Sequence, residues 1–403
     1  MLTPRELQTI AETLYPLLDN LNAWITQDII RRLLARMGRG EEFLLTGTDE
    51  WQIEVYKSAG GHLEALQNKI QHFTKASDEE ITRVFEDIGV RAWDADNLFY
   101  VSQGFESRSI FTSERTMAIL QDTYNRTKGT VHNFTRTTAS ASQKELIKVL
   151  DSTHFKVMTG AQSYTSAVKE AVNEIVKYQA SVVYPTGHVD SLETAVLRAV
   201  RTGVGQAAGE IAVQGMKEHE WDLVRVSAHL GARVGDGGEN PSNHFWWQGG
   251  LYSLSGKDKK YPDFYETTGY GTGEGLCGWN CRHSFGPGDE DHNPFKEYDK
   301  EENKKAYELS QSQRRLEAKI RRQKQKVLGY SEAISSASDE ELKATLRNEY
   351  EKAALQLQKY NKQYNDFCES NSLSKLNDRI SIAKWNRSEA AKATAAARKA
   401  SNG

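Results

Sequence analysis

The chain has 403 residues, with 52 Lys and Arg against 55 Asp and Glu, and 38% of its residues are hydrophobic. A chain of this length is expected to form about two to four domains with a sizeable buried core. The mean hydropathy is −0.66, and no apolar run approaches the roughly 18 residues that a bilayer-spanning helix needs, so we expect no membrane partner.

The first residues and the cysteines both bear on the compartment. The opening MLTPRELQTIAETLY carries charge where a secretory signal peptide needs an apolar core, so we expect no such signal. The three cysteines, Cys277, Cys281 and Cys368, are an odd number and cannot form a disulfide framework among themselves. A reducing compartment is therefore favoured.

The charge is distributed unevenly along the chain. Residues 296–403 hold 23 Lys and Arg against 16 Asp and Glu, a balance of +7, whereas the preceding 295 residues hold 29 against 39, a balance of −10. A basic tail on an acidic body indicates a separate module that meets a negatively charged partner, although a solvated helical surface would show the same composition.

Residues 1–135 are predicted to form a helical domain. Thr3, Pro4 and Glu6 form a helix start, with a cap, a proline at the first helical position and a glutamate at the third. Apolar residues then recur at three- and four-residue steps: Leu7, Ile10, Leu14, Leu17, Leu21, Trp24 and Ile25. This spacing predicts one amphipathic helix that is kinked at Pro16.

Two further helix starts are predicted in this domain. Ser77 is followed three residues later by Glu80, which is the pattern of a capping box, and Ser113 precedes another helical pattern. The apolar stripes favour a helical bundle whose faces form its own core, and docking on a partner is the alternative use of such stripes.

Residues 136–295 are predicted to form a mixed α+β domain. Amphipathic helices are expected at about 142–158 and 163–178. The segment SVVYPTGHVD predicts a β-hairpin that turns at Pro185 and Gly187.

A longer helix and a strand follow in the same domain. Asp190 and Glu193 are predicted to cap a helix that runs to about Lys217, and residues 221–227 alternate like a strand. Fourteen of the 30 glycines then lie between residues 229 and 288, which predicts turns and bends, because glycine is used where the backbone needs unusual dihedral angles. A long irregular stretch of this kind indicates function or assembly.

Residues 296–403 are predicted to form a basic, coiled-coil-like tail. Two long polar helices are expected at 300–336 and 338–369, the second opened by Ser338, and together they predict an antiparallel hairpin that projects from the body. The alanine-rich residues 387–403 predict a weak helix or a frayed end.

The first of these tail helices carries a cluster of cations that could contact nucleic acid. Its members are Arg314, Arg315, Lys319, Arg321, Arg322, Lys324 and Lys326, with Glu317 as the one acid among them. Such a surface suits phosphate groups, so nonspecific contact with double-stranded DNA is one interpretation and a solvated face is the other. There are no interleaved aromatic residues that would stack single-stranded bases.

The glycine-rich stretch also holds the side chains that could do chemistry. Cys277, Cys281 and His283 lie within seven residues, with His229 and His244 upstream, so a zinc site can be counted. The spacing C-x₃-C-x-H is a poor match to the usual zinc-ligand pairs, and we expect no metal and no cofactor. A nucleophilic Cys281 with a histidine base is the enzymatic alternative, and a small buried cysteine in a tight loop is the structural one.

Several motifs in this stretch occur together in one order. They are SAHLGAR (227–233), WQG (247–249), YSLSG (252–256), YPD (261–263), GYGTG (269–273) and GWNCRHS (278–284). In that order the chain resembles the phage minor capsid protein 2 family, relatives of the Mu F-like minor head proteins. The signature residues that the resemblance implies are His229, Gly231, Arg233, His244, Trp247, Gln248, Gly249, Gly271, Gly273, Trp279, Asn280, Cys281, Arg282 and His283.

The resemblance implies a structural role in the head of a tailed phage. Proteins of this kind are present in low copy at the portal vertex or inner capsid surface, so the implied partners are the portal protein, capsid or scaffold proteins and packaged DNA. The implied location is the virion, after assembly in the host cytoplasm, and no catalysis is implied. The alternatives are an enzyme or injected effector with a Cys/His centre and a nonspecific nucleic-acid-binding protein that acts through its basic tail.

Overall fold

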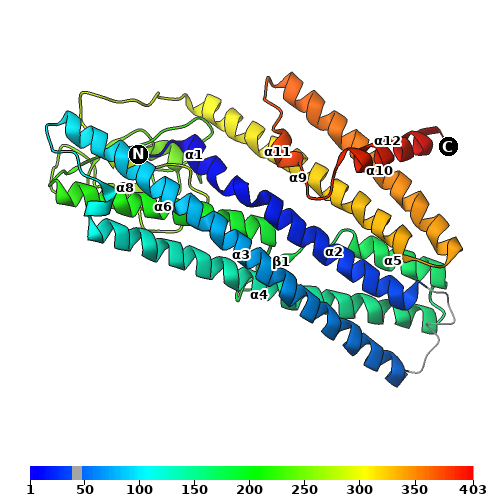
Figure 1. The fold of residues 1–403 in the computed structure, drawn as a ribbon. Coiled ribbons are helices and arrows are strands. Elements are labelled where there is room, and N and C mark those ends of the chain that lie inside the picture. The colour runs from blue at the N-terminus through cyan, green and yellow to red at the C-terminus, as the bar shows by residue number, and fades with distance from the viewer. Residues whose placement is uncertain (39–47, 403) are drawn as a thin grey trace. The chain divides into compact units, whose positions relative to one another are not determined.

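The computed structural model describes residues 1–38 and 48–402, and long helices dominate it (Figure 1). Two small antiparallel sheets, one of two strands and one of three, are the β-structure of the described residues. The expected α+β class, mostly α, is therefore confirmed. No helix among the described residues combines the length and the apolar character that crossing a bilayer requires.

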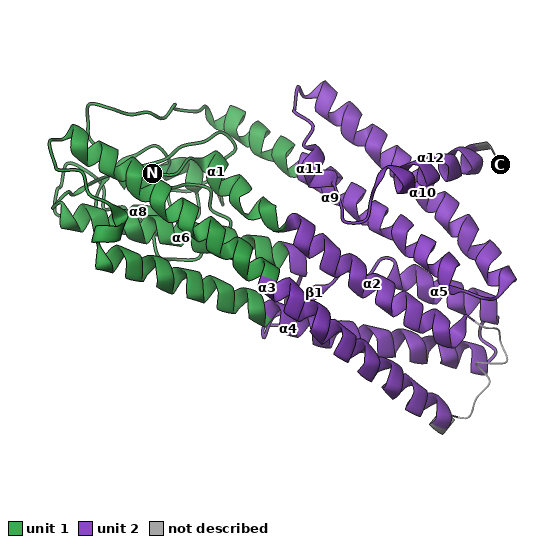
Figure 2. Cartoon of the chain, in the orientation of Figure 1, with its two compact units in different colours: residues 1–14, 76–133, 194–311 green, residues 15–75, 134–193, 312–403 purple. Residues whose placement is uncertain are grey.

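The chain folds into two compact units (Figure 2). Unit 1 consists of residues 1–14, 76–133 and 194–311, and unit 2 of residues 15–75, 134–193 and 312–403. Each unit combines segments from all three regions that the sequence predicts. The division at residues 135 and 295 therefore stays a prediction about sequence modules, and the packing is described below by unit.

The first helical segment begins as predicted. Helix α1 (Pro4–Thr9) begins with a capping box, in which Glu6 N donates to Thr3 Oγ1 at 3.3 Å and Thr3 N donates to Glu6 Oε2 at 2.7 Å. A 3₁₀ turn, η1 (Ile10–Leu14), then precedes α2 (Tyr15–Met37). The predicted single kinked helix is thus divided into two α-helices by a 3₁₀ turn that lies just before Pro16, which has no N–H to donate to the carbonyl four residues earlier.

The next two helices are much longer than predicted. Helix α3 (Thr48–Ser102) runs through Ser77, so the predicted start at that residue is wrong. Helix α4 (Glu114–Met158) likewise contains the whole segment 142–158. The predicted end of that helix at residue 158 is confirmed, but its predicted start at residue 142 is wrong. A Ser-x-x-Glu pattern is compatible with a helix interior when no proline stops the helix, which explains the error. The start at Ser113 is confirmed, because its hydroxyl accepts from Thr116 N at 3.2 Å.

The core of unit 1 forms around a three-stranded sheet. Its strands are β3 (Leu223–Val226), β4 (Leu251–Ser253) and β5 (Phe285–Pro287), in the antiparallel order β4-β3-β5. Helix α6 (Leu192–Glu218) supplies Ala212, Val213 and Met216 to the same apolar cluster. Two short helices, α7 (His244–Trp247) and α8 (Phe264–Thr268), complete it with Trp247 and Phe264.

These elements agree with most of the predictions for the middle of the chain. The predicted strand at 221–227 is confirmed as β3, and the end of the predicted helix near Lys217 as the end of α6. That helix begins at Leu192, two residues after Asp190, which lies in strand β2 with its carboxylate 3.3 Å from His188 Nε2. The glycine-rich stretch is mostly turns, as expected.

The β-hairpin and α5 belong to unit 2. Strands β1 (Ser181–Val183) and β2 (Val189–Ser191) pair antiparallel as predicted, and α5 (Tyr164–Ile175) begins at the cap Ser163.

The C-terminal helices are also packed, rather than projecting. Helix α9 (Lys300–Ser336) has the predicted bounds, and α10 (Glu340–Ser370) is capped by Asp339 instead of Ser338. Within unit 2, Tyr330 on α9 donates to Asn173 Oδ1 on α5 at 2.6 Å, so the predicted free hairpin is wrong.

The end of the chain is ordered by packing on α10. After the short α11 (Asn377–Ile380), helix α12 (Arg387–Asn402) packs on α10 and buries Ala393 and Ala397. Of the two alternatives for residues 387–403, a helix is therefore correct for the described part. Its alanines form a helix because they bury a small apolar stripe against a partner helix.

A buried polar network ties three helices of unit 2 together. The Asp28 carboxylate, on α2, accepts from Arg32 Nε at 2.6 Å and lies 2.7 Å from His62 Nδ1, on α3. The other nitrogen of His62 lies 2.8 Å from the hydroxyl of Ser142, on α4. Arg32 NH2 also donates to Gly61 O at 2.8 Å. Each member has its partners, which is the condition under which a buried charge stabilises a fold.

Candidate functional site

The antiparallel sheet of unit 1 brings distant residues together. Because β3 and β5 are antiparallel neighbours, the residues after β3 lie beside those before β5. Ser227 N donates to Ser284 O at 2.9 Å, and Ser284 N donates to Ser227 Oγ at 2.9 Å, which extends the pairing beyond the strands. The segment that carries His229 is thereby held against the segment that carries Cys281.

A cysteine and two histidines converge at this edge of the sheet. Cys281 Sγ lies 3.7 Å from His244 Nδ1 and 3.8 Å from His283 Nδ1, and the three ligand atoms all lie within 4.8 Å of one another. All three residues are buried. The ring of His229 stacks on that of His283 with 4.4 Å between centroids. We call Cys281, His244 and His283 the Cys/His cluster.

Cys277, a candidate zinc ligand from the sequence, is not part of the Cys/His cluster. Its Sγ faces His283 O at 3.9 Å, the same carbonyl that Cys281 Sγ approaches at 3.8 Å, but it is not one of the three ligand atoms that lie within 4.8 Å of one another. Of the five residues counted for a zinc site, the structure thus brings together Cys281, His244 and His283, with His229 as a neighbour.

Hydrogen bonds on the outer side of the cluster orient the two imidazoles. His283 Nε2 lies 3.1 Å from Gln248 Oε1, and His244 Nε2 lies 2.8 Å from Glu274 O. A carbonyl oxygen accepts hydrogen bonds only, so the tautomer of His283 that matches its contact carries the proton on Nε2, and its Nδ1 lone pair is directed toward Cys281. His244 Nε2 faces two groups of opposite character: it can donate to Glu274 O or accept from the Arg233 guanidinium, which only donates.

Burial keeps the titratable groups of the site neutral. Burial is the main cause that lowers the pKa of His229 to about 4 and of His244 to about 3, and the positive charge of Arg282 adds to it. The pKa of His283 is lowered well below its usual value, and burial raises the pKa of the Cys281 thiol. A buried, protonated thiol is a poor nucleophile, which disfavours the enzymatic interpretation of Cys281.

The loop before Cys281 has a tightly specified backbone. Cys277 and Asn280 have φ values of 58° and 55°, in the left-handed region, and Trp279 N donates to Gly273 O at 2.7 Å. A Cβ on Gly275 would lie 2.2 Å from Gly269 O, and one on Gly278 would lie 2.4 Å from Gly273 O. Only glycine fits at these two positions, neither of which is among the predicted signature residues.

The two arginines of the signature brace loops instead of facing open solvent. Arg282 donates to Gln8 Oε1 at 2.9 Å and to Gly231 O at 3.0 Å. Arg233 NH2 donates to Glu274 O at 2.8 Å and also lies 2.5 Å from His244 Nε2.

The other signature residues lie in the same framework. Gln248 Oε1 accepts from His229 N at 3.0 Å, and the buried Trp247 donates from Nε1 to Pro241 O at 3.0 Å. Asn280 Oδ1 accepts from Arg201 at 3.2 Å. The ring of Trp279 is 60% exposed.

The glycines of the signature serve turns or close contacts. Gly231, Gly249 and Gly271 have positive φ, at 81°, 71° and 93°. At Gly273 an added Cβ would lie 2.8 Å from the Trp279 ring.

A residue far along the chain completes the framework. Asn303, on α9, is fully buried, and its Oδ1 accepts from Gly231 N and Ala232 N, both at 2.8 Å. Its Nδ2 donates to Ala232 O at 2.9 Å. No pattern in the sequence indicates this role, because an asparagine in a polar helix is ordinarily exposed.

The predicted DNA-contacting cations divide into two groups. Arg321 and Lys324 are buried, where Arg321 pairs with Glu193 and donates to Arg379 O, and Lys324 donates to Ile380 O at 2.6 Å. These two act within unit 2, so they are not available to phosphates. Of the other five cations, three are exposed, namely Arg315, Lys319 and Arg322. The remaining two, Arg314 and Lys326, are half-buried.

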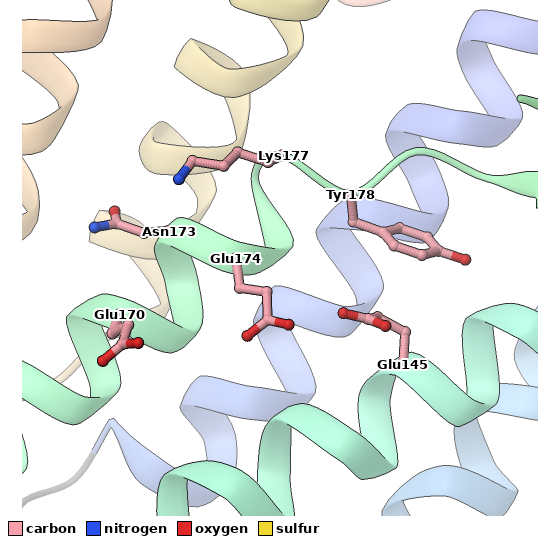
Figure 3. Close-up of a pocket in the computed structure, with 6 residues that line it drawn as sticks. All are labelled: Glu145, Glu170, Asn173, Glu174, Lys177 and Tyr178. Carbon is pink, nitrogen blue, oxygen red and sulfur yellow. The ribbon is translucent and has the colours of Figure 1, made fainter.

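A pocket in unit 2 is the second feature with clustered polar groups. It is lined by Glu145 on α4 and by residues on and just after α5, namely Glu170, Asn173, Glu174, Lys177 and Tyr178 (Figure 3). Its carboxylates already have cations, because Lys148 lies 2.5 Å from Glu174 and Lys156 lies 3.0 Å from Glu170. We assign no ligand to this pocket.

Comparison with known proteins connects the chain to phage structural proteins. The profile of the family described as phage minor capsid protein 2 matches residues 2–369. A protein of Lactococcus phage LL-H named "Structural protein" is 25% identical over 197 residues, which are 44% of this chain and 48% of that protein. The chain thus matches about half the length of this curated relative. No solved structure matches the chain.

Proposed function

Since the chain belongs to the phage minor capsid protein 2 family, we propose that it is a low-copy structural component of a tailed-phage head, docked at the portal vertex or on the inner capsid surface. The observation that carries this proposal is the family match, which extends over nearly the whole chain. The proposed partners are the portal protein and capsid or scaffold proteins.

The site geometry supports a structural role over a catalytic one. The glycine-rich stretch is held by Asn303, by Arg282 and by the Ser227–Ser284 pairing, so its polar groups are used to brace loops. The Cys281 thiol is buried and protonated. We therefore propose that the protein works through its surfaces, and that it does no chemistry.

The test of this proposal is the protein content of purified particles. Quantitative mass spectrometry of virions and proheads should find the chain in both, at far fewer copies than the major capsid protein. Its absence from both particles would overturn the structural role and return attention to an enzyme or effector centred on the Cys/His cluster.

Contact with packaged DNA is the second part of the proposal, and one helix stripe supports it. Arg315, Lys319 and Arg322 are exposed and follow the i, i+4, i+7 spacing of a single helix face. Arg315 donates to the hydroxyl of Ser312, and Lys319 lies 6.0 Å from the centre of the Tyr360 ring. In the part of the chain that the structure describes, none of the three cations pairs with a carboxylate, so all three charges are available to phosphates.

Replacing Arg315, Lys319 and Arg322 together with alanine should weaken binding of the full chain to double-stranded DNA. Each phosphate contact contributes about 0.9 to the slope of log affinity against log salt, so the slope should fall by about 3 if all three make contacts. Fluorescence anisotropy with a random-sequence duplex at several salt concentrations measures this slope.

A charge-matched variant provides the control for this experiment. Lys352, Lys392 and Lys399 are exposed lysines of unit 2, and each is already paired with a glutamate. Their joint replacement with alanine removes the same formal charge but should leave the salt slope unchanged. Equal effects of the two variants would show that general charge, and not this stripe, governs binding.

A further inference from the structure

The Cys/His cluster has a geometry that the structural role alone does not explain. A thiol and two imidazoles are the ligands that zinc prefers in proteins. Here they come from α7 and from the loop before β5, which are 37 residues apart along the chain, yet they meet in one buried place. We propose that Cys281, His244 and His283 bind one zinc-class divalent metal ion.

The distances in the cluster match those of a tetrahedral zinc site. With Zn–S of about 2.3 Å, Zn–N of about 2.0–2.1 Å and a tetrahedral angle between them, sulfur and nitrogen lie about 3.6 Å apart. The two observed sulfur-to-nitrogen distances are 3.7 Å and 3.8 Å. Both sulfur-to-nitrogen distances therefore fit a tetrahedral site to within a few tenths of an ångström, and the two ring nitrogens lie within 4.8 Å of each other.

The outer hydrogen bonds are those that metal-binding histidines ordinarily make. A histidine ligand typically donates its second ring N–H to a carbonyl or carboxylate, which fixes the tautomer and the ring orientation. Gln248 Oε1 and Glu274 O are in place to accept from His283 and His244, at 3.1 Å and 2.8 Å. The Arg233 guanidinium also contacts His244 Nε2, and because it only donates, it must give up this contact when Nε2 carries a proton, while its own bond to Glu274 O remains.

The charge balance and the ligand count also suit a divalent ion. Metal binding requires the Cys281 thiolate. Its negative charge offsets part of the positive charge of the ion and of the nearby Arg233 and Arg282 guanidiniums. Arg282 directs its donors at Gln8 Oε1 and Gly231 O, away from the sulfur. Three protein ligands leave the fourth tetrahedral position for a small ligand such as water. The ion would lock α7 to the loop before β5.

Cobalt(II) is the probe that tests this site, because it takes zinc geometries and absorbs visible light. Metal-free full-length protein titrated with Co²⁺ should bind one equivalent and develop a thiolate-to-cobalt charge-transfer band with tetrahedral d–d bands. Zinc added afterwards should abolish both. A folded protein, judged by circular dichroism, that shows neither band would overturn the proposal.

Two variants in the same loop show which sulfur is the ligand. Cys281→Ser should lose the charge-transfer band, whereas Cys277→Ser should keep it, because Cys277 is equally buried but its sulfur lies outside the cluster. A band that survives Cys281→Ser would contradict the assignment.

A measurement on the unaltered protein covers the case in which Cys281→Ser does not fold. The protein as purified should contain about one equivalent of zinc, and a chelator should remove it and lower the thermal unfolding midpoint. Zinc should then restore that midpoint. A midpoint that is insensitive to both chelator and zinc would contradict the proposal. Because this readout is independent of particle content, its failure would leave the proposed capsid role untouched.

Discussion

Replacing Asp28 with alanine is expected to destabilise the fold by about 3–5 kcal/mol, because the change leaves buried partners without their anion. The carboxylate of Asp28 is the shared partner of Arg32 and His62, at 2.6 Å and 2.7 Å. Without it, His62 is fully buried with one nitrogen unsatisfied, and the link between α2 and α3 is lost. Chemical denaturation followed by circular dichroism measures the loss.

The matched control is an exposed pair with the same spacing. Asp87 and Arg91 are also four residues apart on a helix, at 3.0 Å, but their side chains are 52% and 44% exposed. Exposed pairs of this kind contribute about 0.3–0.5 kcal/mol, so Asp87→Ala should cost far less than Asp28→Ala. Equal losses in the two variants would show that the Asp28 network contributes little.

The effect of Asp28 should also depend on pH. Burial alone would raise the pKa of Asp28, but the hydrogen bonds from His62 and Arg32 outweigh it and hold the pKa below the usual 3.8. A lowered native pKa contributes stability that is fully present above the unfolded value and is lost as pH falls through the native value. The difference in stability between wild type and Asp28→Ala should therefore be constant near neutral pH and shrink below about pH 4.

Replacing Asn303 with alanine should have the second large effect, because it leaves three backbone groups without partners. Gly231 N, Ala232 N and Ala232 O all bond the Asn303 side chain, which is 0% exposed. Each unsatisfied buried group costs about 1–3 kcal/mol, so the total loss should reach about 3 kcal/mol or more.

The role of Asn303 can be tested locally by amide hydrogen exchange and compared in two further variants. Hydrogen exchange at the amides of Gly231 and Ala232 should accelerate in Asn303→Ala. Asn303→Asp keeps the acceptor for both amides, so exchange at these two amides should accelerate less than in Asn303→Ala, although a carboxylate oxygen then faces Ala232 O. Asn348→Ala, at an exposed position of α10, should stay within about 0.5 kcal/mol of wild type. Unchanged exchange at residues 231 and 232 would contradict the role given to Asn303.

The sequence predicted those elements whose signals are local. The caps at Thr3 and Ser113, the hairpin at β1 and β2 and the bounds of α9 follow from turn chemistry, capping and periodicity over a few residues. The false start at Ser77 arose because a capping pattern is not unique to helix ends. Only the packing of α3 decides that the helix continues there.

The site depends on contacts between distant residues, and these were not predictable from spacing. The C-x₃-C-x-H spacing disfavoured a metal because Cys277 was counted as a ligand, whereas in the fold it is the upstream candidate His244, and not Cys277, that lies with Cys281 and His283. Likewise, the sequence could not distinguish the buried Arg321 and Lys324 from their exposed neighbours, because all occur in one polar helix. Burial of a charged residue depends on a partner elsewhere in the chain.

The packing of α9 also affects how the tail can be tested. Residues 300–311 of this helix belong to unit 1 and residues 312–336 to unit 2. Deleting residues 296–403 would therefore remove part of both units, including Asn303 and its bonds to the glycine-rich stretch. Surface substitutions such as those at Arg315, Lys319 and Arg322 separate tail contacts from folding, and a truncation does not.

Docking of this protein at the portal is tested by measuring its content in proheads that are assembled with and without the portal protein. Quantitative mass spectrometry should find it in a fixed, low ratio to portal subunits in complete proheads, and should find it lost from portal-less shells. Equal amounts in both kinds of shell would contradict docking at the portal, and its absence from both would contradict a role in the head.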